Sequence, residues 1–193
     1  ELDSIWNYYL SLEKDLDNTS RYIEPIGQED VHSFEFAKLL ILACTEVESV
    51  LKAICFEIEG KQVAGDIAAY KGTILNKYPK IVESTVIASR LGKNLTPFKE
   101  WKNGKLSWWE AYQKVKHNRG EFFNQATYRN VVSAISALYV LIFYLAKITD
   151  LTFRDNKSSY IDSQYAHGYL LIGPFETLPD FKEKTPHDQL RLP

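Results

Sequence analysis

An uncharged, apolar run of sixteen residues, 131–146 (VVSAISALYVLIFYLA), constrains the fold of this 193-residue chain more than any other feature. A helix needs roughly 20 apolar residues to span a bilayer, and this shorter run includes two Ser and two Tyr. We therefore expect no membrane contact. A helix that is apolar on nearly all sides must be covered on several faces. The run predicts the central helix of a soluble bundle, or a helix that a partner covers.

A second long helix is indicated upstream. Apolar residues recur at helical spacing through residues 34–59, with Ser33 placed as an N-cap and Gly60 as a stop signal. Length and strong periodicity predict that the helices near 34–59 and 125–148 form an antiparallel core pair.

Shorter elements complete the predicted body. Further helices are expected over residues 3–18, 62–78, 81–89 and 107–117, the last capped by Ser107. Residues 90–105 predict a loop, because Gly, Pro and Asn-Gly signals cluster there. We therefore predict an all-α fold in which residues 1–150 form an antiparallel helical bundle. Residues 151–193 contain four of the seven prolines without helical periodicity, and they predict an irregular tail packed on the bundle.

The two cysteines indicate a reducing compartment. Cys44 and Cys55 fall within one predicted helix, about 16 Å apart at ~1.5 Å per residue, which is too far for a disulfide. We expect both to be small buried hydrophobes in a cytoplasmic protein. The N-terminal residues show no signal peptide. No His or second Cys stands at ligand spacing, so we expect neither a metal nor a cofactor.

Positive charge and tryptophan gather between residues 93 and 119. This stretch holds seven Lys or Arg, two Glu and three of the four Trp, in a chain whose formal net charge is -2. Cations suit phosphate groups, and aromatic rings suit unstacked bases. The pattern is compatible with a surface for single-stranded RNA. The alternative is a pair of core-facing Trp beside a solvated, Lys-rich loop.

The candidate site is centred on residues 108–119. Its members offer a ring, an amide or a positive charge, and they are Trp108, Trp109, Lys114, Lys116, His117, Asn118 and Arg119. His117 can act as a general acid or base. Lys116 and Arg119 can stabilise charge on phosphate oxygens. The alternative for His117 is a structural role, bonded to a backbone carbonyl.

Two segments, FAKLLILACTEVESVLKAIC and WWEAYQKVKHNRGEFFNQATYRNVVSAISALYVLIFYL, resemble a HEPN-superfamily domain. The resemblance covers residues 1–149. It rests on the order of the helices, the acidic TEVESVLK of the second long helix, and the Lys-His-x-Arg turn that opens the last one. It implies an all-α, commonly dimeric bundle of prokaryotic toxin–antitoxin and phage-defence systems. Many members of the family are metal-independent RNases.

The family signature is Arg, then four to six residues, then His. The corresponding positions before His117 hold Tyr112, Ala111 and Glu110, so His117 alone carries over. We expect a catalytically silent, RNA-binding HEPN-like domain that forms a homodimer and has an antitoxin or another protein as a further partner. One alternative is a metal-independent endoribonuclease in which His117, with Arg119 and Lys116, leaves a 2′,3′-cyclic phosphate. Another is a non-enzymatic helical dimerisation scaffold.

Overall fold

The computed structural model describes residues 2–88, 91–149 and 180, and this part of the chain is mostly helical, as the apolar periodicity predicts. Its α-helices are α1 (Leu2–Thr19), α2 (Phe34–Glu59), α3 (Ile67–Lys77), α4 (Ser107–His117), α5 (Arg119–Phe122) and α6 (Tyr128–Thr149). Three 3-10 turns, η1 (Pro79–Glu83), η3 (Lys99–Lys102) and η4 (Phe123–Gln125), and two strands, β1 (Val86–Ala88) and β2 (Lys93–Leu95), complete it.

Helix α2 begins and ends where the sequence predicts. The Phe36 N–H donates to Ser33 Oγ at 3.1 Å, which satisfies one of the free donors of the first turn. Gly60 follows the last turn with φ 66°, and its N–H donates to the Phe56 carbonyl at 2.8 Å. A left-handed residue suits glycine at this position, so both ends of α2 are set by local hydrogen bonds.

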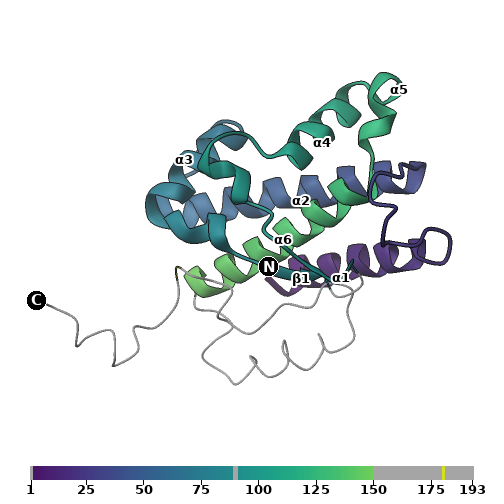
Figure 1. The fold of residues 1–193 in the computed structure, drawn as a ribbon. Helices are drawn as coiled ribbons and strands as arrows, with labels where there is room; N and C mark the ends of the chain where they lie inside the picture. Colours follow the sequence, from purple (N-terminus) through teal and green to yellow (C-terminus); the bar gives the residue numbers. More distant parts are fainter. Residues whose placement is uncertain (1, 89–90, 150–179, 181–193) are drawn as a thin grey trace, which may run out of the picture.

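Helices α2 and α6 form the central pair, but the prediction that they are antiparallel is wrong. Both helices begin at the same end of the molecule and run in the same sense (Figure 1). Their N-termini are joined there by a β-bridge between His32 and Thr127 and by a 3.0 Å hydrogen bond from the Tyr128 N–H to the Val31 carbonyl. We call this place the junction end. Apolar periodicity carries no information on helix direction, so the pattern could not decide this point.

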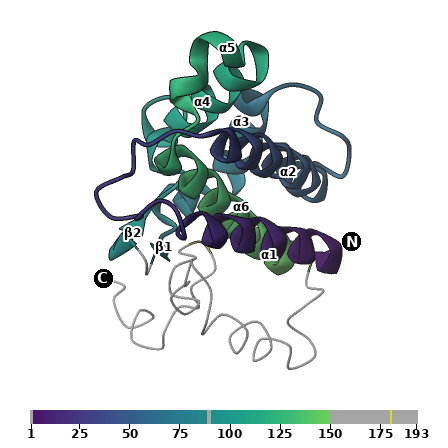
Figure 2. The ribbon, with the colours of Figure 1, turned by 90° about the vertical axis from the view of Figure 1, so that its right-hand side faces the viewer.

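Helices α1 and α4 run toward the junction end, opposite to α2 and α6, and pack against them (Figures 1 and 2). On α1, the Tyr9 ring meets the Tyr139 ring of α6 edge-on, with centroids 5.2 Å apart. The predicted bundle therefore exists, with α1 and α4 supplying the antiparallel neighbours of the central pair.

Helix α6 is buried by other helices of the same chain. It has the length and composition of a membrane span, yet 83% of its apolar 18-residue window is buried in the fold. The same burial removes the argument that led to a homodimer, namely apolar surface on α6 that one chain could not hide. The homodimer stays a prediction.

Two local predictions before α4 are wrong. Residues 81–89 were expected to be helical, but they contain the end of η1 and strand β1. Residues 90–105 were expected to be a loop, yet they contain β2 and η3. Strand β1 pairs antiparallel with β2, with Val86 opposite Leu95. The β-branched pair Val86 and Ile87 fits a pleated strand better than a helix.

Cys44 and Cys55 are free and buried in the core, as predicted. Burial raises the pKa of the Cys55 thiol to about 11, and it raises the pKa of Cys44 as well. Both thiols therefore stay protonated at neutral pH and act as apolar packing groups.

The tail predicted for residues 151–193 lies outside the described residues, apart from Asp180. The carboxylate of Asp180 accepts hydrogen bonds from the Tyr144 hydroxyl at 2.8 Å and from the Lys80 backbone N–H at 3.1 Å. This residue therefore contacts the body near the C-terminal part of α6.

Candidate nucleic-acid interface

The tryptophans of α4 belong to the core. Trp108 is 2% exposed and Trp109 is 6% exposed. The Trp108 Nε1–H donates to the buried Pro97 carbonyl at 2.9 Å, and its ring meets Phe98 edge-on. The prediction that these two residues offer ring faces to RNA is therefore wrong, because the apolar side of α4 packs against α2 and α6.

The polar end of α4 lies at the surface. We define the α4–α5 corner as the five predicted site residues that are exposed there, Lys114, Lys116, His117, Asn118 and Arg119. It lies at the junction end (Figure 1). Cations in the last turn of a helix also interact favourably with the helix dipole. The positive charge here therefore stabilises α4 whether or not RNA binds.

Asn118 shapes this corner. It ends α4 with φ -149° and ψ 74°, and its N–H donates to the Lys114 carbonyl at 2.9 Å. Its side-chain oxygen accepts from the Glu121 N–H at 3.3 Å, and its side-chain amide donates to the Glu121 carboxylate at 2.9 Å. The Asn118 side chain is therefore occupied in capping α5, and its predicted role toward RNA would compete with this.

Each cation of the corner lies against an aromatic ring. The Lys114 Nζ is 5.8 Å from the centroid of Phe122, and the Arg119 guanidinium carbon is 5.8 Å from that of Phe34. Lys116 donates to the Tyr112 hydroxyl at 3.0 Å. That hydrogen bond raises the pKa of Lys116, so its ammonium stays charged at neutral pH. Among the described residues, none of these three cations forms a salt bridge, although the more distant charge of Glu48 also raises the pKa of Lys116.

His117 is exposed beside Arg119, at the end of α4. Within the described part of the chain, its ring has no hydrogen bond or ion pair that would orient it. The bond to a backbone carbonyl that would mark a structural histidine is therefore not made by these residues. The ring is free to meet a ligand at the surface.

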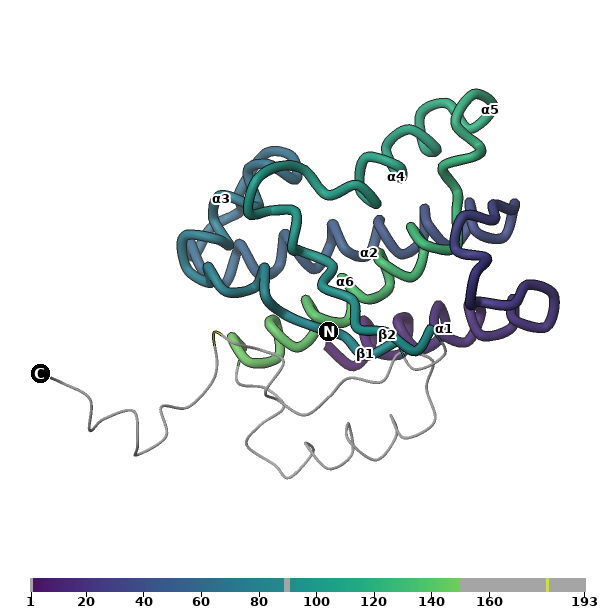
Figure 3. Tube along the Cα trace, in the orientation of Figure 1, coloured from purple at the N-terminus to yellow at the C-terminus, as the bar shows by residue number. Residues whose placement is uncertain are grey.

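Three of the four remaining lysines of the basic stretch form salt bridges outside the corner. Lys93 pairs with Glu29 at 2.8 Å, Lys102 with Glu83 at 3.8 Å, and Lys105 with Glu110 at 3.7 Å. Strand β2 lies beside α1, on the far side of the molecule from α5 (Figure 3). The positive charge that is contiguous in sequence is therefore divided in space, and carboxylates from other segments offset part of it.

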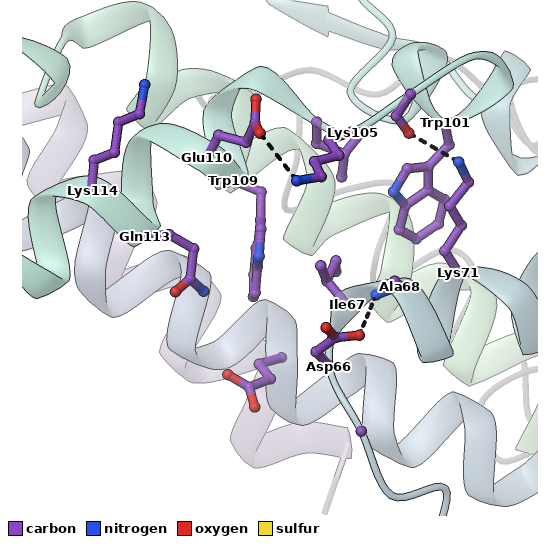
Figure 4. A pocket seen from close by; sticks show the side chains of 14 residues that line it. Asp66, Ile67, Ala68, Lys71, Trp101, Lys105, Trp109, Glu110, Gln113 and Lys114 are labelled. Atoms are coloured by element: carbon purple, nitrogen blue, oxygen red, sulfur yellow. Dashed lines mark hydrogen bonds and ion pairs between the residues drawn. The ribbon is translucent and has the colours of Figure 1, made fainter.

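A cleft of about 570 Å³ lies between the start of α3 and one side of α4. Trp109 points into this cleft, and Lys114 is among the residues that line it (Figure 4). Its rim carries cations and carboxylates together, and several are already used. Lys71 donates to the Gly104 carbonyl at 2.9 Å, and Asp66 caps α3. The cleft therefore has no excess of either charge to attract a phosphate.

Sequence reasoning missed the exposed aromatic residue of this region. Phe34 is 72% exposed and lies directly beside Arg119. The helical pattern contained the signal, because the core positions of α2 run through Phe36, Leu40 and Ala43. Phe34 is the first residue of the helix and lies off that stripe.

Comparisons with protein-family models, curated proteins and solved structures found no match for this chain. The HEPN resemblance therefore rests on the quoted segments. Among the described residues, no group of three or more His, Cys, Asp or Glu is placed to hold a metal ion.

Proposed function

We propose that this chain is a HEPN-like helical module that binds RNA through the α4–α5 corner, without cleaving it. The observation that carries the proposal is the exposure of Lys114, Lys116 and Arg119 together at one helix end, with no salt bridge to a described carboxylate. When such cations neutralise the phosphates of an RNA, condensed counterions are released, and this release favours binding. The resemblance, which keeps a His at this turn, supports the same location.

Binding is favoured over catalysis for a geometric reason. A general acid or base must be held at a set position relative to the proton it transfers. Neither His117 nor Arg119 has a hydrogen bond to another described side chain that would hold it. The family's Arg is also absent from its usual place before His117.

The experiment is an RNA titration of the full chain at two salt concentrations. Replacing Lys116 and Arg119 together by Ala is expected to weaken binding to any RNA sequence. The slope of log affinity against log salt should fall by about 2, roughly one unit for each cation. No RNA binding by the wild type at low salt would overturn the proposal.

A matched control removes the same charge elsewhere. Lys99 and Lys102 are exposed on η3, which precedes α4, whereas α5 follows it. The two ends of this 11-residue helix are about 16 Å apart at ~1.5 Å per residue. The double variant Lys99→Ala, Lys102→Ala should change the slope much less. Equal losses in both variants would indicate attraction by net charge alone.

The same samples test the endoribonuclease alternative. A gel of the bound RNA should show no products. Cleavage to a 2′,3′-cyclic phosphate that His117→Ala abolishes would favour catalysis instead, since general acid–base catalysis contributes about 10²–10⁴-fold.

A further inference from the structure

Phe34 belongs to a cluster of aromatic rings and is not an isolated exposed residue. The Phe34 and Phe123 rings lie 4.8 Å apart between centroids, with planes tilted by 33°. The His32 ring meets Phe123 edge-on at 5.1 Å. Scattered exposed hydrophobic residues are normal on protein surfaces. Three rings connected through Phe123, with a guanidinium beside Phe34, are a more specific arrangement.

The cluster is held by the backbone at the junction end. Its rings come from two segments far apart in the chain, the start of α2 and η4. The bridge between His32 and Thr127 joins these segments, and the Arg129 N–H donates to the Glu29 carbonyl at 2.9 Å. Phe34 is therefore presented on a fixed support, next to the cations of the α4–α5 corner.

We propose that one unpaired base of a bound RNA stacks on the Phe34 ring, beneath the Arg119 guanidinium. This inference rests on the proposed function and narrows it to single-stranded RNA. A base in a duplex is already stacked on its neighbours, whereas a splayed base is free to stack on an aromatic or guanidinium plane. Lys114 and Lys116 would then hold the flanking phosphates.

The spacing fits this arrangement after a small movement. Carbon atoms in contact are ~3.5 Å apart, so a base between two planes needs about 7 Å. The guanidinium carbon is now 5.8 Å from the Phe34 centroid. A shift of about 1 Å by an exposed side chain would open that space. In the absence of RNA the guanidinium lies over the ring by a cation–π contact, which keeps it near its bound position.

The test compares three ligands of one length, namely a single-stranded RNA, the corresponding duplex, and a single strand with abasic residues. Phe34→Ala is expected to weaken binding of the first about 5- to 150-fold, equivalent to the roughly 1–3 kcal/mol of one stacked base. It should leave the duplex and the abasic strand unchanged, because these use the phosphate contacts alone. Phe34→Trp, which keeps an aromatic ring at this position, should bind the single strand as the wild type does.

Phe56→Ala is the matched control, because Phe56 is another exposed phenylalanine of α2, 46% exposed and at the opposite end of the helix. It should bind all three ligands as the wild type does. If Phe34→Ala binds the single strand normally while the Lys116, Arg119 double variant does not, the stacking inference is wrong and the proposed function stands. If the wild type binds none of the ligands, both are wrong.

Discussion

At the residue scale, α4 separates its rings from its charges. Trp108 and Trp109 are buried, whereas His117, Lys116 and Arg119 are exposed. Neighbouring residues of α4 and the start of α5 therefore contribute to different properties, one set to stability and the other to any ligand contact. Substitutions can separate the two roles. A change at a buried ring should alter fold stability and leave RNA affinity unchanged, and a change at an exposed cation should do the reverse.

Trp108→Phe is predicted to destabilise the fold without changing RNA affinity. The phenyl ring cannot donate to the buried Pro97 carbonyl, whose partner is the Trp108 Nε1–H. An unsatisfied buried acceptor costs about 1–3 kcal/mol. Urea unfolding should show this loss, while Phe34→Ala, which removes an exposed ring, should stay within about 0.5 kcal/mol of the wild type. A loss of RNA binding by folded Trp108→Phe would contradict the assignment of this ring to the core.

At the element scale, two glycines have opposite roles in their helices. Gly60 ends α2 with a left-handed φ of 66°, whereas Gly72 lies inside α3. Around both positions there is space, because a Cβ added to either would meet nothing within 4 Å. Any effect of a methyl group at these sites must therefore come from the backbone.

Alanine at the two positions should change stability in opposite directions. Gly60→Ala is expected to lower the free energy of unfolding by about 1 kcal/mol, because an L-residue is strained in the left-handed region. Gly72→Ala is expected to raise it by about 0.4–1 kcal/mol, because alanine restricts the unfolded chain and favours a helix. Thermal unfolding followed by circular dichroism measures both. A stabilising Gly60→Ala would show that the cap geometry is wrong.

At the scale of the whole molecule, α6 links the helices into one body. Helices α1, α2 and α4 all pack against it, and sixteen of its residues are buried. If any one of these three helices were displaced or unfolded, the apolar surface of α6 would be exposed. We therefore expect the described body to unfold as one cooperative unit.

Leu138→Ala tests this cooperativity. Leu138 is fully buried in α6, and truncation of a buried leucine costs about 2–5 kcal/mol. The urea midpoints from circular dichroism and from tryptophan fluorescence should shift together, because the tryptophans of α1, η3 and α4 pack on the same core. Separate midpoints, in the variant or in the wild type, would mean that the body contains more than one folding unit.

The sequence by itself determined most of the helical segments and where the longest one ends, although it wrongly predicted a helix over residues 81–89. Ser33 and Gly60 act through hydrogen bonds within a few residues, so their meaning is readable locally. The burial of Cys44 and of the run at 131–146 was also predictable, because the apolar face of a helix, and an uncharged apolar run still more, must be covered. These predictions depend on composition and spacing alone.

Only the tertiary structure decided how those helices are directed and which side chains meet. An apolar stripe on a helix is the same when it is read in either direction, so it could not predict that α2 and α6 run parallel, with their N-termini meeting at the bridge between His32 and Thr127. The inward position of Trp108 depends on a carbonyl in a preceding loop, at Pro97. The contact of Arg119 with Phe34 joins segments far apart in the chain. Such contacts follow from packing the whole core, which no local pattern encodes.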